Sequence, residues 1–296
     1  MVRFLYSILM QLLIPGALIR LWFRGRAEPA YRHHLAERFG HVPSNLGSGA
    51  DIWLHAVSAG ESIAAGPLIE ALLAQGHTLV LSTTTPTGRA QLMRQFSGRA
   101  VICYGPFDVP RCVKRFLNQV RPKLALMIET EIWPNWMTLC ASRAIPVALI
   151  NARLSERSFR GYQKLGSMMG ATLRQFSWIA VQSTVHAARF KALGAAPDRL
   201  SVTGSIKADQ VLPADFRAQV AVIQEKLAHR TLLLAASTHP GEEQMLLAAF
   251  KVLKAKHPQL LMVLVPRHVQ RAAELQAMSA QLGLIQSLAD KDHFTD

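Results

Sequence analysis

Short apolar runs alternate with helix-period stretches between residues 49 and 206, and this alternation constrains the fold more than any other feature of the chain. Parallel strands that are buried on both faces read as continuous apolar runs, and the segments between them cross over as helices. The pattern therefore predicts an α/β fold made of βαβ units. We expect strands at residues 52–57, 78–84, 101–106, 123–129, 146–151 and 178–183, with a short one at 200–206.

Residues 207–296 begin a second series of the same kind. A chain of 296 residues is long enough for two α/β units. Two strands with open edges make a poor domain by themselves, so we expect this series to be the first part of a second domain. Its predicted strands and helices alternate, at 231–237, 242–256, 260–266 and 269–283.

The first 23 residues are predicted to attach the chain to a membrane. Residues 4–23 are mostly apolar, and about 20 such residues span a bilayer core. Arg20 lies near the end of this stretch and can snorkel, while further arginines in a basic connector at 24–48 favour a cytoplasmic location for that flank. A buried helix is one alternative. A secretory signal is another, although no small-residue cleavage site follows.

The charge balance points to an anionic partner. Lys and Arg number 33 against 19 Asp and Glu, which gives a net charge of +14. Acidic lipid, phosphorylated substrate and nucleic acid all fit such a charge. The basic residues cluster after the apolar segment and at strand ends, without a recognisable nucleic-acid-binding module, so we expect no nucleic-acid partner.

Cysteine and histidine spacing predicts no metal site and no cofactor. Cys103, Cys112 and Cys140 form no C-x-x-C pair, which indicates a reducing setting without a disulfide framework. Asp290 and Asp292 form a D-x-D pattern typical of metal-dependent sugar transferases. Because that pattern lies in a polar tail after a predicted helix, we assign it no metal role.

The strongest candidate for catalysis follows the first predicted strand, in His55-Ala-Val-Ser58-Ala-Gly60-Glu61-Ser62. Ligands of such sheets bind at the carboxyl ends of the strands. The helix dipole is expected to favour the ionised form of Glu61, and an exposed carboxylate there can act as a general base. Ser58 and Gly60 are candidate substrate-binding residues of the same turn. The alternative is that Glu61 only complements the helix dipole.

A second acidic segment follows the predicted strand at 123–129. If the strand persists, alternation points Glu129 and Glu131 the same way. Two acids beside two tryptophans and a proline indicate a binding site. The alternative is a charged strand end, with Trp133 and Trp136 in the core.

Basic residues follow several other predicted strands. Arg89, Arg153 and Arg157 stand at helix entries, where guanidinium groups can hold phosphates. Lys207 follows the short strand at 200–206 and can offset charge on a departing phosphate. Arg267 holds the equivalent position in the second series. Surface solvation is the alternative for each of them.

These segments together resemble the Kdo (3-deoxy-manno-octulosonic acid) transferases of lipopolysaccharide assembly, over essentially the whole chain. The resemblance implies a GT-B fold with two facing Rossmann-like domains, at the cytoplasmic face of the inner membrane. It implies a lipid acceptor, the lipid A precursor lipid IVA, on the first domain and the donor CMP-Kdo mainly on the second. The segments that carry it are, in order, RLWFRGRAEPAYR, HAVSAGES, STTTPTGR, ETEIWPN, NARLSERS, TGSIKAD, STHPGEE and VPRH.

The resemblance also implies residue roles and an inverting, metal-independent transfer. Glu61 matches the proposed catalytic base of the family. Glu129 and Lys207 match positions assigned to transition-state stabilisation, and Arg267 and His268 match a pair that contacts CMP.

Two departures from the family pattern bear on these roles. Ala208 stands where the family usually has an aromatic residue, and the glycine-rich G-G-S and G-G-H-N-x-x-E segments of the second domain do not occur before Asp296. We therefore expect an incomplete donor domain. The alternatives are a non-catalytic, membrane-docked protein that binds the lipid A precursor and another GT-B transferase that acts on a lipid acceptor.

Overall fold

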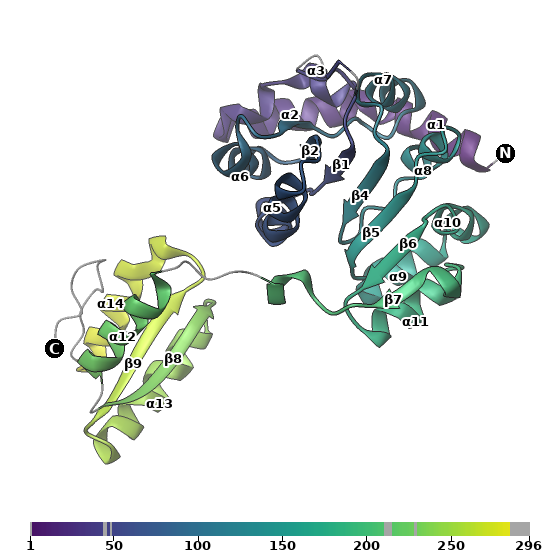
Figure 1. The fold of residues 1–296 in the computed structure, drawn as a ribbon. Helices are drawn as coiled ribbons and strands as arrows, with labels where there is room; N and C mark the ends of the chain where they lie inside the picture. Colours follow the sequence, from purple (N-terminus) through teal and green to yellow (C-terminus); the bar gives the residue numbers. More distant parts are fainter. Residues whose placement is uncertain (1, 44–45, 48, 210–214, 228–229, 285–296) are drawn as a thin grey trace. The chain divides into compact units, whose positions relative to one another are not determined.

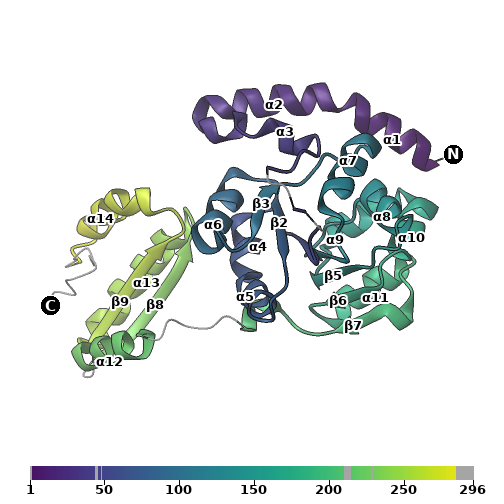
Figure 2. The ribbon, with the colours of Figure 1, turned by 45° about the horizontal axis from the view of Figure 1, so that its top comes forward.

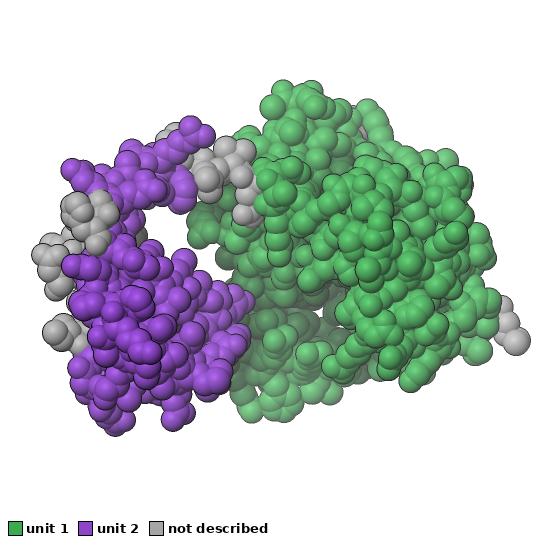
Figure 3. Space-filling view, turned by 90° about the horizontal axis from the view of Figure 1, so that it is seen from below, with its two compact units in different colours: residues 1–211 green, residues 212–296 purple. Residues whose placement is uncertain are grey.

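A computed structural model describes residues 2–43, 46–47, 49–209, 215–227 and 230–284. The chain divides into two compact units, residues 1–211 and residues 212–296, which Figure 3 distinguishes by colour. The division falls close to the predicted boundary after residue 206. Unit 1 also contains the N-terminal apolar segment and the basic connector.

Unit 1 is built on a seven-stranded sheet in the order β3-β2-β1-β4-β5-β6-β7, and every paired neighbour is parallel (Figure 1). This confirms the predicted Rossmann-like, doubly wound architecture. The strand order reverses direction between β1 and β4, which is where such sheets open a ligand crevice. The strands are β1 (Ile52–His55), β2 (Leu79–Thr83), β3 (Val101–Tyr104), β4 (Leu124–Ile128), β5 (Val147–Ala152), β6 (Trp178–Val181) and β7 (Leu200–Val202).

Helices cover both faces of this sheet, so alternate strand residues enter different cores. Trp53 joins one apolar cluster with Phe116, while Leu54 joins the other with Ile69 and Leu92. All five are fully buried or nearly so, as expected for strands covered on both faces. The helices of unit 1 beyond the N-terminal segment are α3 (Leu35–Arg38), α4 (Ala59–Ala64), α5 (Gly66–Ala74), α6 (Pro86–Phe96), α7 (Pro110–Val120), α8 (Pro134–Ala141), α9 (Glu156–Gln163), α10 (Gly166–Leu173) and α11 (Thr184–Ala192).

The connection between β1 and β2 is not one continuous helix. It is two helices, α4 and α5, that meet at Ala65. Pro67 stands in the first turn of α5, where its missing N–H leaves no hydrogen bond unmade, and it restricts the residue before it. Gly76 ends α5 with a φ of 82°, as its predicted capping position requires.

The N-terminal segment forms α1 (Val2–Leu12) and α2 (Ile14–Ala27), which run along the outside of the α/β part of unit 1 in both ribbon views (Figures 1 and 2). The Tyr6 hydroxyl donates to Asp108 Oδ2 at 2.7 Å, and the Ser7 hydroxyl donates to Asn135 Oδ1 at 2.8 Å. These bonds tie α1 to the loop before α7 and to the start of α8. The helix therefore docks on the domain through its polar side.

The other side of this segment exposes large apolar groups to solvent. Residues 2–27 together are long and apolar enough to cross a membrane by length and composition, a property shared by buried helices and secretion signals. What distinguishes the segment is the exposure of its apolar side chains. The exposed ones are Val2, Phe4, Leu5, Ile8, Leu9, Leu12, Leu13, Ile19, Trp22 and Phe23.

Unit 2 holds a two-stranded parallel sheet, β8 (Thr231–Thr238) and β9 (Leu260–Pro266), with helices α12 (Phe216–Leu227), α13 (Glu242–Lys256) and α14 (Ala272–Gln281). The bounds of α13 confirm the prediction for residues 242–256. Gly241 is the N-cap residue of α13 and has no side chain that could cap the helix. The Glu242 carboxylate instead accepts the backbone N–H of His239 at 2.7 Å.

Candidate active site

The site begins at the carboxyl end of β1, where a short turn leads into α4. Ser58 caps α4 by accepting the backbone N–H of Glu61. In return, Glu61 Oε2 accepts the backbone N–H of Val57 at 2.7 Å, and Oε1 accepts the Ser58 hydroxyl at 3.0 Å. This reciprocal arrangement resembles a capping box, so the capping role predicted as the alternative is present. Each carboxylate oxygen keeps a further lone pair for a substrate hydroxyl.

The protonation of Glu61 differs from the sequence expectation. The residue is partly buried rather than exposed, and burial raises the pKa of its carboxyl above the usual range. The hydrogen bonds from Val57 and Ser58 oppose that rise, and the charge of Glu129 adds to it. The prediction that Glu61 is an exposed carboxylate is therefore wrong, and burial is the largest influence on its pKa. A raised pKa suits a general base that works near neutral pH.

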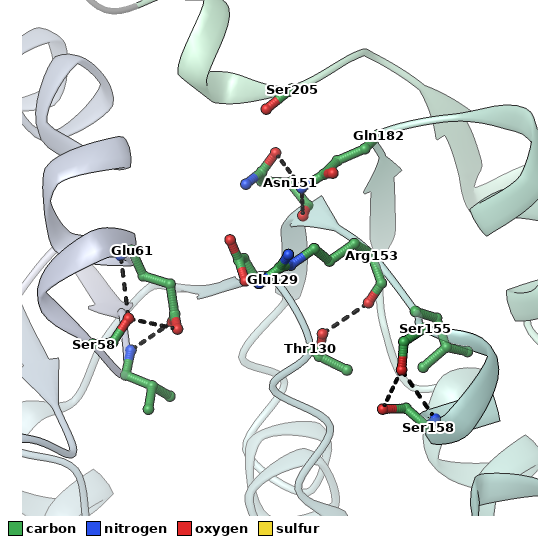
Figure 4. Close-up of polar contacts among 12 residues, drawn as sticks. Ser58, Glu61, Glu129, Thr130, Asn151, Arg153, Ser155, Ser158, Gln182 and Ser205 are labelled. Carbon is green, nitrogen blue, oxygen red and sulfur yellow. Dashed lines mark hydrogen bonds and ion pairs between the residues drawn. The ribbon is translucent and has the colours of Figure 1, made fainter. Parts of the chain in front are cut away.

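Glu129 lies across the strand-order reversal, directly after β4. Its backbone adopts a φ of 67°, so the strand does not persist and the prediction that Glu129 and Glu131 share one face is wrong. Its side chain is buried, and Oε2 accepts Arg153 Nε at 2.7 Å. Figure 4 shows the carboxylates of Glu61 and Glu129 directed into the same space.

Arg153 reaches Glu129 from the segment after β5. The Thr130 hydroxyl donates to the backbone carbonyl of Arg153 at 2.8 Å, which ties the ends of the two neighbouring strands together. The side chain of Arg153 is 54% exposed, so its guanidinium keeps donors free for an anionic ligand. Arg89 differs, because its guanidinium forms an internal ion pair with the buried Glu37 at 3.2 Å.

Glu131 turns inward to a polar chain that sequence reasoning does not identify. Trp133 Nε1 donates to Glu131 Oε2 at 2.6 Å, and His55 Nε2 lies 3.8 Å from the same oxygen. The other ring nitrogen of His55 is 2.7 Å from Ser82 Oγ, which also accepts Trp53 Nε1–H at 2.7 Å. Because Ser82 accepts that indole hydrogen, its own hydroxyl hydrogen is available to His55 Nδ1. The Nε2 hydrogen is then directed at Glu131.

The protonation of Glu131 and His55 determines the charge that lies beside the carboxylates of Glu61 and Glu129. Burial raises the pKa of Glu131 to about 7, and the charges of Glu61 and Glu129 add to the rise. Burial lowers the pKa of His55 to about 3, so the imidazole stays neutral at physiological pH. A histidine inside an apolar strand is the sequence signal for this buried pair.

Asn151 and Gln182 are two further residues that sequence reasoning missed. Asn151, near the end of β5, is 1% exposed and has a φ of 57°. The amide of Gln182 donates to Asn151 O at 3.1 Å and to Oδ1 at 2.9 Å. A polar residue after an apolar run is their only sequence signal, and it does not separate them from ordinary strand ends.

The remaining predicted residues divide between the units. Lys207 is exposed in the short 3₁₀ helix η3 (Ile206–Asp209), after β7 in unit 1. Gly60 lies in the first turn of α4, and a Cβ there meets only Ser58 Oγ at 3.9 Å, so the position does not require glycine sterically. Arg267 and His268 are exposed after β9 in unit 2. Unit 1 thus gathers Ser58, Gly60, Glu61, Glu129, Arg153 and Lys207 at strand ends.

Within the described ranges, no three His, Cys, Asp or Glu side chains are grouped as a metal site requires. The D-x-D pattern at Asp290 and Asp292 lies outside the described residues.

The fold of the chain is that of the GT-B-like proteins. The structure resembles a UDP-GlcNAc 2-epimerase from Neisseria meningitidis bound to UDP-GlcNAc, with a TM-score of 0.54 at 15% identity, over 81% of this chain and 72% of that one. At such low identity the likeness shows the fold alone.

Sequence comparison identifies the family. Residues 33–210 match the family model described as 3-deoxy-D-manno-octulosonic-acid transferase (kdotransferase). A 3-deoxy-D-manno-octulosonic acid transferase of Haemophilus influenzae is 36% identical over 91% of this chain and 64% of its own length, and one of Bordetella pertussis is 35% identical over 93% and 67%. The chain belongs to the Kdo transferase family. It spans about two thirds of the length of these relatives.

Replacing Glu131 should change how the stability of unit 1 depends on pH. The pKa of this carboxyl is about 7 in the folded protein and near 4.5 in the unfolded chain. Between these values the unfolded state releases the proton first, so folding stability falls as pH rises, by up to about 3 kcal/mol. Glu131→Gln should remove the decrease in folding stability that arises from this carboxyl group.

Urea unfolding from pH 5 to pH 8 measures this effect. Tryptophan fluorescence reports on unit 1, because all five tryptophans of the chain lie in residues 1–211. Part of the fall should remain in the variant, since burial also raises the pKa of Asp108, to about 6. Parallel stability curves for Glu131→Gln and wild type would show that Glu131 is not the buried acid described here.

Proposed function

We propose that this protein is a glycosyltransferase that moves Kdo from CMP-Kdo to the lipid A precursor lipid IVA, and that unit 1 binds the lipid acceptor. The single observation that carries the proposal is the pair of carboxylates, Glu61 and Glu129, on the two sides of the strand-order reversal. Membership of the Kdo transferase family supports Kdo as the transferred sugar. The acceptor, the donor and the inverting course rest on the site chemistry and on the motif resemblance.

In the proposed reaction, Glu61 takes the proton from the attacking hydroxyl of the acceptor sugar. That oxygen forms a bond to the anomeric carbon of Kdo, while the bond from this carbon to the phosphate oxygen of CMP breaks. The electron pair leaves with CMP, and the configuration at the carbon inverts without a covalent intermediate. The proton remains on Glu61 until solvent removes it. This course requires no metal ion and no redox cofactor.

The neighbouring charges have separate roles in this proposal. The transition state of glycosyl transfer carries positive charge near the anomeric carbon, which a carboxylate stabilises. Glu129 supplies this carboxylate, and its ion pair with Arg153 holds it in place. Lys207 offsets the negative charge that develops on the departing phosphate. Arg267 and His268 of unit 2 contact CMP, with the guanidinium on its phosphate.

We further propose that the protein attaches to the cytoplasmic face of the inner membrane through α1 and α2. The support is the exposed apolar side of these helices together with the polar ties from Tyr6 and Ser7 to the domain. A helix held to the domain on one side offers its other side to lipid in the plane of the membrane. The basic connector that follows suits anionic headgroups.

Glu61→Gln should lower Kdo transfer by at least about a hundredfold, because proton transfer by a positioned base contributes about 10² to 10⁴ in rate. Thermal stability should change by at most about 1 kcal/mol, since a charge in a first helical turn is usually worth about that much and the glutamine amide oxygen can still accept the backbone N–H of Val57. Glu70→Gln is the matched control, because that glutamate lies on α5 in an exposed ion pair with Arg99. Transfer is measured on protein extended to the length of its matched relatives, of which this chain spans about two thirds. Near-normal turnover in Glu61→Gln would remove it as the base.

Leu12→Glu should weaken membrane attachment. Leu12 is 71% exposed on α1, so a charge there does not disturb the core and must instead enter the lipid interface. Gln11→Glu adds the same charge at a neighbouring exposed polar position and should have a much smaller effect. Co-sedimentation with vesicles that contain anionic lipid separates the two variants. Equal binding by both would mean that this side of α1 does not contact the membrane.

A further inference from the structure

A lateral chain of hydrogen bonds links the ends of β5, β6 and the segment after β7. Gln182, which follows β6, holds both the backbone carbonyl and the side chain of Asn151. Asn151 Oδ1 in turn accepts the backbone N–H of Ile206 at 3.1 Å. Ile206 immediately precedes Lys207. Figure 4 shows Asn151 between Gln182 and the segment that carries Ser205, with Glu129 and Glu61 beyond it.

The orientation of the Asn151 amide follows from these bonds. A backbone N–H can only donate, so the atom that faces Ile206 must be the carbonyl oxygen Oδ1 rather than the nitrogen Nδ2. Gln182 Nε2 donates to the same oxygen at 2.9 Å, which fixes the assignment a second time. Two donors from different strand ends therefore converge on one side-chain oxygen.

Two unfavourable features of Asn151 indicate that this position is held for a purpose. Its φ of 57° lies in the left-handed region, which asparagine enters more readily than most other non-glycine residues but still at a cost. Its Nδ2 group is buried and has no hydrogen-bond partner within the described part of the chain. A buried amide without a hydrogen bond and a left-handed backbone both lower the folding stability. Such destabilising features occur most often at functional sites, where the surrounding structure maintains a required geometry.

We propose that Asn151 is a positioning residue for Lys207, because its side-chain oxygen ties the backbone of the Lys207 segment to the sheet edge that bears Glu129. The role assigned to Lys207 rests on the proposed function, whereas the tie itself does not. Apart from the bond between Ile206 N–H and Asn151 Oδ1, residues 204–207 have few restraints within the described part of the chain. Gly204 has a φ of 83° and open space around it, and Ser205 Oγ accepts only the nearby Lys207 N–H, at 3.4 Å.

Hydrogen exchange tests the tie without any activity measurement. Asn151→Gly removes the side chain and keeps the left-handed backbone accessible, whereas Asn151→Asp retains an acceptor oxygen. In the chain as it stands, the peptide containing Ile206 should exchange about tenfold faster in Asn151→Gly, from the loss of one hydrogen bond. Asn151→Asp should restore most of the protection. Peptides from β1 and β4 should be unchanged in both variants and serve as the internal control for folding.

Kinetics then test whether the tie acts through Lys207. In protein extended to the length of its matched relatives, Asn151→Gly should lower kcat with little change in KM, and Asn151→Asp should recover most of the loss. In a Lys207→Ala background the same glycine substitution should have almost no further effect, because the residue it positions is gone.

Three results are decisive. Unchanged exchange at Ile206 in Asn151→Gly would overturn the tie. An effect of Asn151→Gly that persists in full in Lys207→Ala would overturn positioning of Lys207. A Lys207→Ala variant with normal turnover would instead contradict the proposed role of Lys207, and exchange at Ile206 would still decide whether the tie exists.

Discussion

The sheet of unit 1 is covered on both faces, and this constraint determines where chemistry can occur. Trp53 and Leu54 are adjacent in β1 and both fully buried, one in each apolar cluster. Uncompensated polar groups in such strands are costly, so the reactive residues follow the strands instead. Because the strand order reverses between β1 and β4, the segments after these two strands place Glu61 and Glu129 on the two sides of the reversal, where such sheets bind their ligands.

The three neighbouring carboxyl groups of Glu61, Glu129 and Glu131 differ in their burial and in their partners. Glu129 is held in place by Arg153, whose Nε lies 2.7 Å from Oε2 of the carboxylate. Glu131 has no cation to balance it, since burial keeps His55 neutral, and its pKa rises to about 7. A proton on Glu131 reduces the like charge beside Glu61, whose own pKa is raised by burial. Two neighbouring acids with raised pKa values, Glu61 and Glu131, therefore lie beside a third carboxylate, Glu129, that is held by an arginine.

Periodicity in the sequence was enough to predict the sheet, and each apolar run contains a strand. It could not predict how the strands end. Glu129 leaves the strand pattern through a positive φ, which residue identity does not indicate because glutamate seldom adopts it. The break at Ala65 and the buried pair of His55 and Glu131 depend on long-range packing. Asn151 was missed because its importance lies in a bond to Ile206, 55 residues away, that no local pattern contains.

The most direct test is transfer of labelled Kdo from CMP-Kdo to lipid IVA, by protein extended to the length of its matched relatives and with a strong chelator present. The proposed mechanism predicts a lipid-bound product of inverted anomeric configuration at an undiminished rate, because carboxylate, lysine and arginine side chains supply all the charge required. Retained configuration, dependence on an added metal ion, or hydrolysis of CMP-Kdo without transfer to the lipid would contradict it.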